Sequence, residues 1–181
     1  MVEKVEYEEK CPAALATTFV SKESRGVREL RDILFPLDPE AKVVKTEFRD
    51  VLLIYTRLSR EELKRVFVKL KPSSVARLFI ADLCIILEDE KDIAKIIDSS
   101  VELFISKHRG SRFYVDCVKR GRFIDKCHPI EAEIGSRISI SGHGFVDYKN
   151  PDVLIKIEVI NRIVLISIIK PEEDRLRKRV I

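Results

Sequence analysis

Two apolar segments separated by Asn161 and Arg162 constrain the fold of this chain more than any other part of its sequence. Residues 153–160 and 163–169 are rich in Ile and Val, which favour strands. Asn can adopt the positive φ that a tight hairpin turn requires. The second segment is apolar on both faces, so we expect it to be a central strand. The sequence therefore predicts a sheet that contains this hairpin.

The segment before the hairpin predicts a strand, a basic turn and a helix. Residues 112–118 alternate between apolar and other side chains, as in a half-buried strand. Residues 119–122, Lys-Arg-Gly-Arg, are expected to form a turn at Gly121. Pro129 suits the first turn of a helix, in which Gly135 would allow a close contact. The apolar stripe of this helix would consist of Ile130, Ile134 and Ile138.

The N-terminal half predicts the order strand–helix–strand–strand–helix–strand, which is that of a ferredoxin-like split βαβ unit. The expected strands cover residues 14–20, 42–48 and 51–57, with one more inside 75–87, and the expected helices cover residues 26–35 and 59–70. Ser21 or Ser24 would cap the first helix. Ser59 and Glu62 have the spacing of a capping box at the second helix.

A long amphipathic helix is expected next, from Asp89 or Asp92 to about residue 106, with Gly110 as a possible cap. We place the domain boundary just before this helix. Residues 1–87 would form the N-terminal ferredoxin-like domain and residues 88–181 a second domain. The predicted fold class is therefore α/β (α+β), with the N-terminal unit packed on the C-terminal one.

The composition predicts a cytoplasmic protein. No apolar run approaches the roughly 20 residues of a membrane-spanning helix, and the N-terminus is too acidic and polar for a secretory signal. The chain has no Gln, no Trp, one Met and two Asn, while Lys, Arg and Glu are abundant. This bias is typical of proteins from hyperthermophiles.

The positive charge is concentrated in one part of the sequence. Residues 107–126 contain seven basic and two acidic residues, whereas residues 1–106 carry a small negative balance. Such clustering is typical of an anion-binding patch, because phosphate contacts supply most non-specific nucleic-acid affinity. The alternative is an ordinary solvated charged face, as is common in thermophile proteins. Phe113, Tyr114 and Phe123 could offer stacking faces for bases.

The sequence contains no recognisable catalytic or cofactor motif. It lacks G-x-S-x-G, G-x-x-x-x-G-K-[ST] and G-x-G-x-x-G patterns, and we interpret residues 142–144, Gly-His-Gly, as a turn. We therefore expect a non-catalytic protein without cofactor or metal. The four cysteines have no C-x-x-C pair, so reduced thiols are the default. A Cys117–Cys127 bridge, or a metal held by these two with His128 and His143, remains an alternative.

Three stretches carry a resemblance to a known family. FYVDCVKRGR, HPIEAEIGSRI and FVDYKNPDVLIKIEVI make residues 75–181 similar to a THUMP domain, and residues 13–87 resemble the ferredoxin-like unit that precedes it. The resemblance implies a domain that binds the acceptor stem and CCA end of tRNA. Within the family, the chain looks like the stand-alone Tan type of thermophilic archaea. That type implies an adaptor for an RNA cytidine acetyltransferase that makes N4-acetylcytidine in tRNA.

The resemblance also implies which residues contact RNA. Lys119, Arg120 and Arg122 match the basic segment after the strand, and residues 149–151 match the turn before the next strand. Asp147 and Asn150 would tie that turn. The full set of RNA-binding candidates, from charge clustering and resemblance together, is Arg109, Arg112, Lys119, Arg120, Arg122, Lys126 and Lys149. The alternatives are a protein-interaction module, an RNA-binding module of another tRNA modification pathway, and metal-dependent RNA chemistry.

Overall fold

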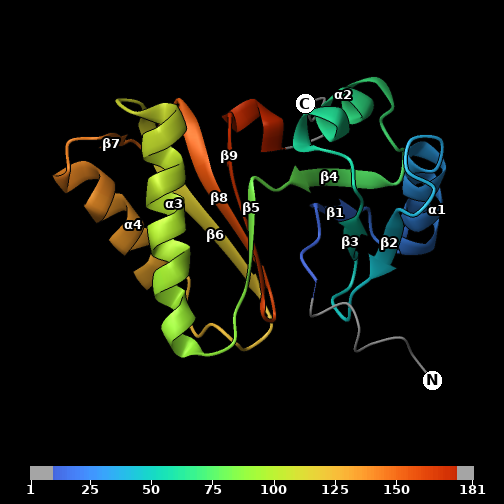
Figure 1. Ribbon diagram of the computed structural model, residues 1–181, viewed down its shortest axis with the longest axis horizontal. Helices are drawn as coiled ribbons and strands as arrows, with labels where there is room; N and C mark the ends of the chain where they lie inside the picture. Colours follow the sequence, from blue (N-terminus) through green and yellow to red (C-terminus); the bar gives the residue numbers. More distant parts are fainter. Residues whose placement is uncertain (1–9, 175–181) are drawn as a thin grey trace. The chain divides into compact units, whose positions relative to one another are not determined.

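The computed structural model describes residues 10–174. The described chain divides into two compact units. The N-terminal unit comprises residues 12–81 with 172–174, and the C-terminal unit comprises residues 10–11 and 82–171. Both units combine helices with a β-sheet (Figure 1), which confirms the predicted α/β class.

The N-terminal unit has the predicted ferredoxin-like topology. Its elements are β1 (Ala14–Thr18), α1 (Glu23–Leu34), β2 (Lys42–Lys45), β3 (Val51–Tyr55), α2 (Arg60–Lys69) and β4 (Val75–Ile80). The strand order is β2-β3-β1-β4, and every pairing is antiparallel. The core lies between the sheet and the two helices, with Leu30, Leu52, Ile54 and Leu63 fully buried.

The two helices of this unit begin differently. At α2 the capping box is present as predicted: the Ser59 hydroxyl accepts from the Glu62 N–H, and the Glu62 carboxylate accepts from the Ser59 N–H. The predicted serine cap of α1 is wrong, because Lys22 is the N-cap and makes no side-chain cap hydrogen bond. Ser21 instead has a φ of 62°, in the left-handed region.

The C-terminal unit is a five-stranded mixed sheet with two helices. Its elements are β5 (Leu83–Ile86), η1 (Glu90–Asp92), α3 (Ile93–His108), β6 (Arg112–Arg120), α4 (His128–Ile140), β7 (Phe145–Val146), β8 (Val153–Ile160) and β9 (Ile163–Ile169). The short helix η2 (Pro171–Asp174) follows β9, and its residues after Pro171 belong to the N-terminal unit. The strand order is β5-β9-β8-β6-β7. β6 runs parallel to β7 and β8, whereas β9 is antiparallel to β5 and β8. Both helices lie on the same side of this sheet (Figure 1).

The apolar hairpin occupies the position that its sequence predicts. β9 lies between β5 and β8, and every residue of β8 and β9 is buried. Asn161 has a φ of 52°, as a tight turn requires. The stripe of α4 is buried with the hairpin in one core. A Cβ added at Gly135 would lie 3.5 Å from Val146, an ordinary van der Waals distance, so the contact expected at this position does not require glycine.

The strand β5 corrects the predicted domain boundary. The apolar run 75–87 contains two strands, and the second of them belongs to the C-terminal sheet. The chain passes from one sheet to the other between two consecutive residues. The Ala81 N–H donates to the Ala13 carbonyl at 3.0 Å, whereas the Asp82 N–H donates to the Ile166 carbonyl at 2.9 Å. The C-terminal unit therefore resumes at Asp82, because β5 finds its hydrogen-bonding partner in β9.

The cysteines divide into a disulfide and a free pair. Cys11 and Cys84 form a disulfide with an S–S distance of 2.08 Å across a sequence separation of 73 residues. Cys117 and Cys127 are free thiols. The default of reduced cysteines is therefore wrong for the first pair.

Candidate nucleic-acid interface

The strand β6 distributes the predicted basic residues over two ends of the C-terminal sheet. Arg112 begins this strand and Arg120 ends it, so the two lie roughly 26 Å apart at about 3.3 Å per residue. Lys119 and Arg120 also belong to the strand and not to a turn, because they pair in parallel register with Val159 and Ile160. The expectation of one patch at one turn is therefore wrong.

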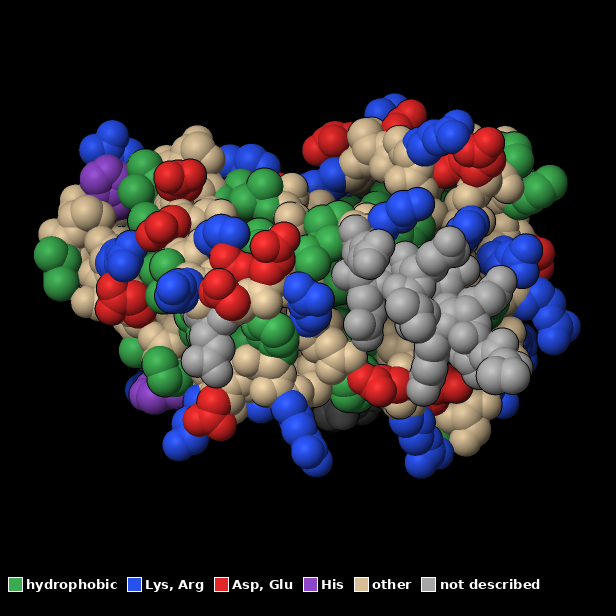
Figure 2. Space-filling view, turned by 60° about the horizontal axis from the view of Figure 1, so that its bottom comes forward, with side chains coloured by type: hydrophobic (Ala, Val, Ile, Leu, Met, Phe, Trp, Pro, Cys, Tyr) green, Lys and Arg blue, Asp and Glu red, His purple; other side chains and the backbone are tan. Residues whose placement is uncertain are grey.

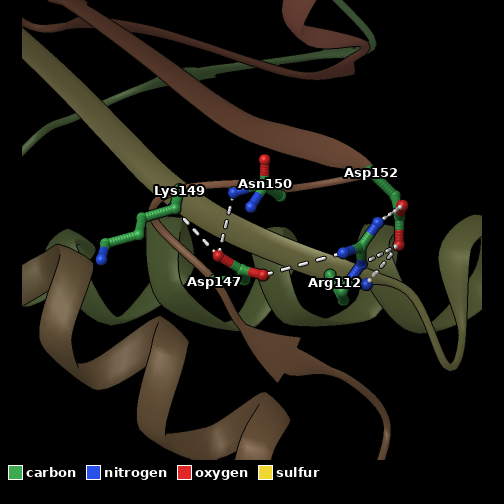
Figure 3. Close-up of polar contacts among 5 residues, drawn as sticks. All are labelled: Arg112, Asp147, Lys149, Asn150 and Asp152. Carbon is green, nitrogen blue, oxygen red and sulfur yellow. Dashed lines mark hydrogen bonds and ion pairs between the residues drawn. The ribbon is translucent and has the colours of Figure 1, made fainter.

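At the first end of β6, Arg112 holds two carboxylates (Figure 3). Its Nη2 lies 2.7 Å from Asp152 Oδ1, its Nε lies 3.2 Å from Asp152 Oδ2, and its Nη1 lies 3.8 Å from Asp147 Oδ2. The hydrogen bonds between Arg112 and Asp152 raise the pKa of the guanidinium and lower the pKa of the carboxyl. Two carboxylates thus balance the charge of Arg112, which ties β6 to the segment before β8.

The turn that follows β7 is built on Asp147. Its Oδ1 accepts hydrogen bonds from the N–H groups of Lys149 at 2.9 Å and Asn150 at 3.0 Å, which lower the pKa of this carboxyl. The hydrogen bonds that we expected to hold this turn are therefore accepted by the Asp147 side chain. In Figure 3 the amine of Lys149 points away from the carboxylates. Lys149 and Arg109, the C-cap of α3, are both exposed and remain candidate contacts at this end.

At the second end, residues 119–126 form a segment that we call the basic loop. Two of its cations are engaged internally: Lys119 Nζ donates to the Ile124 carbonyl at 2.8 Å, and Arg120 Nη1 lies 2.6 Å from Oε2 of the fully buried Glu158. Arg122 and Lys126 are exposed. Within the described chain, neither of these two makes a side-chain hydrogen bond or ion pair. These two cations are therefore available to a ligand.

Gly121 shapes the basic loop where it meets the hairpin turn. It has a φ of +96°, and a Cβ there would lie 2.1 Å from Asn161 Oδ1 and 3.2 Å from Asn161 Cα. Arg162, next in the hairpin turn, lies with its Cζ 5.9 Å from the centre of the Phe123 ring and donates from Nε to the Leu87 carbonyl at 2.6 Å. Nothing in the sequence pattern singles out Arg162, because only the register of Arg120 with Ile160 places it beside the basic loop.

Both helices also begin at this second end. The Leu87 N–H donates to the Arg162 carbonyl at 2.8 Å, and α3 begins soon after at Ile93. Asp92 precedes α3, and its hydrogen bond with Lys95 lowers the pKa of its carboxyl to about 2. By contrast, the N-cap of α4 is Cys127, which makes no side-chain cap hydrogen bond. The positive end of the α4 dipole therefore adds to the field of the basic loop.

The groups at the second end are of the kinds that bind anions in other proteins. This end presents cations, a helix N-terminus and the half-buried Phe123 ring. The residues considered as a metal site do not converge, because the His143 carbonyl accepts from the Gly110 N–H beside the first end. Over residues 10–174 no group of three or more His, Cys, Asp or Glu side chains could hold a metal ion. No helix in that range is long and apolar enough to cross a membrane.

The surface carries both signs of charge. On the face shown in Figure 2, Lys and Arg side chains are interspersed with Asp and Glu side chains. Such mixing fits the alternative of a generally charged surface in a thermophile-like composition. What distinguishes the second end of β6 from this background is the pair of exposed cations that make no side-chain hydrogen bond or ion pair within the described chain, Arg122 and Lys126.

No protein-family model matches the sequence, and no curated protein matches it. Solved structures do match. TrmN from Thermus thermophilus is similar at a TM-score of 0.66 and 18% identity, over 92% of this chain and 47% of that one. PH1313 from Pyrococcus horikoshii OT3 is similar at a TM-score of 0.66 and 18% identity, over 87% of this chain and 54% of that one. A 4-thiouridine synthetase, solved with RNA and ATP, is similar at a TM-score of 0.60 and 16% identity, over 88% of this chain and 41% of that one.

These matches establish that this chain shares its fold with a part of each of those proteins. It spans about half of their length. The shared fold does not transfer the binding or catalytic activity of those whole proteins to this chain.

Proposed function

We propose that this chain is a tRNA-binding protein of the THUMP class that acts in tRNA modification. The observation that carries the proposal is the pair of exposed, internally unengaged cations Arg122 and Lys126 beside the uncapped start of α4. The fold supports it, because a 4-thiouridine synthetase with the same fold was solved with RNA. The motifs FYVDCVKRGR and FVDYKNPDVLIKIEVI support the assignment to the THUMP class.

The basic loop would contact the phosphates of the acceptor stem and CCA end. Arg122 can grip two phosphate oxygens at once, and Lys126 adds a point charge near the α4 N-terminus. Arg162 and the ring of Phe123 lie beside them. The first end of β6, with exposed Arg109 and Lys149, is the second place that an RNA backbone could touch. A cytoplasmic location would fit such a role.

The test is a charge reversal of the two available cations, Arg122→Glu with Lys126→Glu. We expect at least a tenfold loss of tRNA affinity, since two phosphate contacts become two repulsions. We also expect the slope of log K against log salt to become shallower by about 1.4 to 1.8, at roughly 0.7 to 0.9 for each phosphate. Fluorescence anisotropy of labelled tRNA over a salt series measures both quantities.

The matched control is Arg109→Glu with Lys149→Glu, which makes the same change in net charge at the first end of β6. A smaller loss in this control is expected. Equal losses in both variants would show that the two ends of β6 contribute alike, so that affinity does not depend on the basic loop in particular. Unchanged affinity in the Arg122→Glu/Lys126→Glu protein, with an unchanged thermal midpoint, would contradict the proposal.

We further propose that the chain is a non-catalytic adaptor for an RNA cytidine acetyltransferase that forms N4-acetylcytidine in tRNA. The support is the resemblance to the stand-alone Tan type. Deleting the gene should abolish acetylated cytidine in tRNA, as mapped by mass spectrometry of digested tRNA. The Arg122→Glu/Lys126→Glu gene should fail to restore it, and the wild-type gene should succeed. Unaltered acetylation would contradict the adaptor role, and loss of a different modification would assign the chain to that pathway.

A further inference from the structure

The free cysteines of the C-terminal unit lie at nearly bonding distance. Cys117 Sγ and Cys127 Sγ are 2.6 Å apart. Non-bonded heavy atoms prefer separations of about 3.5–4.0 Å, whereas bonded sulfurs lie about 2.05 Å apart. The two sulfurs are therefore nearer to a covalent bond than to a packing contact, and very little movement separates them from a disulfide.

The backbone around the pair is held by other contacts. Cys117 is buried in the core face of β6, and its N–H donates to Glu131 Oε1 at 2.9 Å, which ties the strand to α4. Cys127 is the half-buried N-cap of α4. Strand and helix thus bring the two sulfurs together before any bond forms. Residues 118–126, which include the whole basic loop, form the segment between them.

We propose that Cys117 and Cys127 are a reversible disulfide site that locks the basic loop onto the start of α4. The oxidant is a second disulfide, from a small thiol or a protein. The more exposed Cys127 thiolate attacks one sulfur of that disulfide, forms a mixed disulfide and releases one thiolate. The Cys117 thiolate then attacks Cys127 Sγ and releases the other. The two cysteines lose two electrons and two protons in total, and the oxidant gains them as two thiols.

One observation supports this chemistry in this chain, and a second limits its rate. Cys11 and Cys84, in the same unit, form a disulfide, so this unit already contains one pair of cysteines in the oxidised state. Burial raises the pKa of both the Cys117 and the Cys127 thiols. Because thiolate is the attacking species, oxidation should be slow near neutrality and should accelerate about tenfold per pH unit below the pKa.

The lock would also act on RNA binding, and this consequence rests on the proposed function. The Cys117–Cys127 disulfide would close a ring of backbone that contains Arg122 and Lys126, and it would remove conformational freedom from both residues before any ligand arrives. A pre-ordered loop loses less entropy on association, so the oxidised protein should bind tRNA several-fold more tightly than the reduced one.

The experiment uses the full chain, equilibrated in buffers of reduced and oxidised glutathione at pH 7, 8 and 9. Free thiols are then alkylated with iodoacetamide under denaturing conditions and counted by intact mass. We expect two thiols to disappear together and return on reduction, with peptide mapping showing the 117–127 link. The Cys117→Ser/Cys127→Ser protein should show no such change, whereas Cys11→Ser/Cys84→Ser should retain it.

Alkylation of both thiols after every oxidising treatment would overturn the proposal, and so would glutathione adducts without an internal link. Neither result depends on a variant that must fold. Affinity for tRNA is measured separately on the oxidised and reduced forms. Equal affinities would refute the effect on the loop while the link itself stands. If neither form bound tRNA, the proposed function would fail and the thiol count would still decide the disulfide.

Discussion

Replacing Arg120 with Leu is expected to lower the free energy of unfolding by about 3–5 kcal/mol, the range found when one partner of a buried ion pair is removed. The guanidinium Nη1 lies 2.6 Å from Oε2 of Glu158, whose side chain is fully buried in β8. Without Arg120 that carboxylate loses the cation that balances it in the interior. Urea denaturation followed by circular dichroism, at a temperature where the wild type unfolds within the accessible range, measures the loss.

Two further variants separate charge from shape. Arg122→Leu makes the same substitution at an exposed position two residues along and should change stability by no more than about 0.5 kcal/mol. The double variant Arg120→Leu/Glu158→Leu removes both charges and should recover most of the loss, since apolar replacements of buried pairs are often neutral. A double variant no more stable than Arg120→Leu would show that packing, and not the buried charge, sets the cost.

Breaking the Cys11–Cys84 disulfide should have an effect of similar size. The bond closes a loop with a sequence separation of 73 residues, and its loss restores about 4 kcal/mol of chain entropy to the unfolded state in the loop-closure treatment. We expect Cys84→Ser to lower the thermal midpoint by several degrees under non-reducing conditions. Differential scanning calorimetry provides the measurement.

The comparison is made in a Cys117→Ser/Cys127→Ser background, so that one cystine alone responds to reductant. There, dithiothreitol should lower the midpoint of the protein with Cys84 to that of the protein with Cys84→Ser, and should leave the latter unchanged. A midpoint insensitive to dithiothreitol in the protein that retains Cys84 would argue against a stabilising disulfide.

Local patterns predicted the elements whose determinants are close together in sequence. The capping box of α2 depends on Ser59 and Glu62, three residues apart, and the β8–β9 turn depends on Asn161 alone. The spacing of strands and helices likewise indicated the ferredoxin-like order of the N-terminal unit. Each of these features is decided within one turn or one element, where backbone sterics and hydrogen bonding act between near neighbours.

Two features that depend on pairing between distant strands were missed. The end of β6 was expected after Val118, but Lys119 and Arg120 continue the strand because β8 offers Val159 and Ile160 as partners. The apolar run 75–87 gave no sign that its second strand leaves the first sheet for β9. A glycine, or a break in the alternation of apolar and polar residues, indicates where a strand can end. Hydrogen bonding to a strand that is distant in sequence decides where it does end.

For the candidate site, the sequence by itself determined that positive charge is concentrated in residues 107–126. Only the tertiary structure decided which of those charges a ligand can use. A strand that rises about 3.3 Å per residue separates Arg112 from Arg120, and carboxylates distant in sequence, Asp152 and Glu158, balance them. Arg122 and Lys126 stay available because the chain has left the sheet there, and strand pairing no longer brings a carboxylate to them.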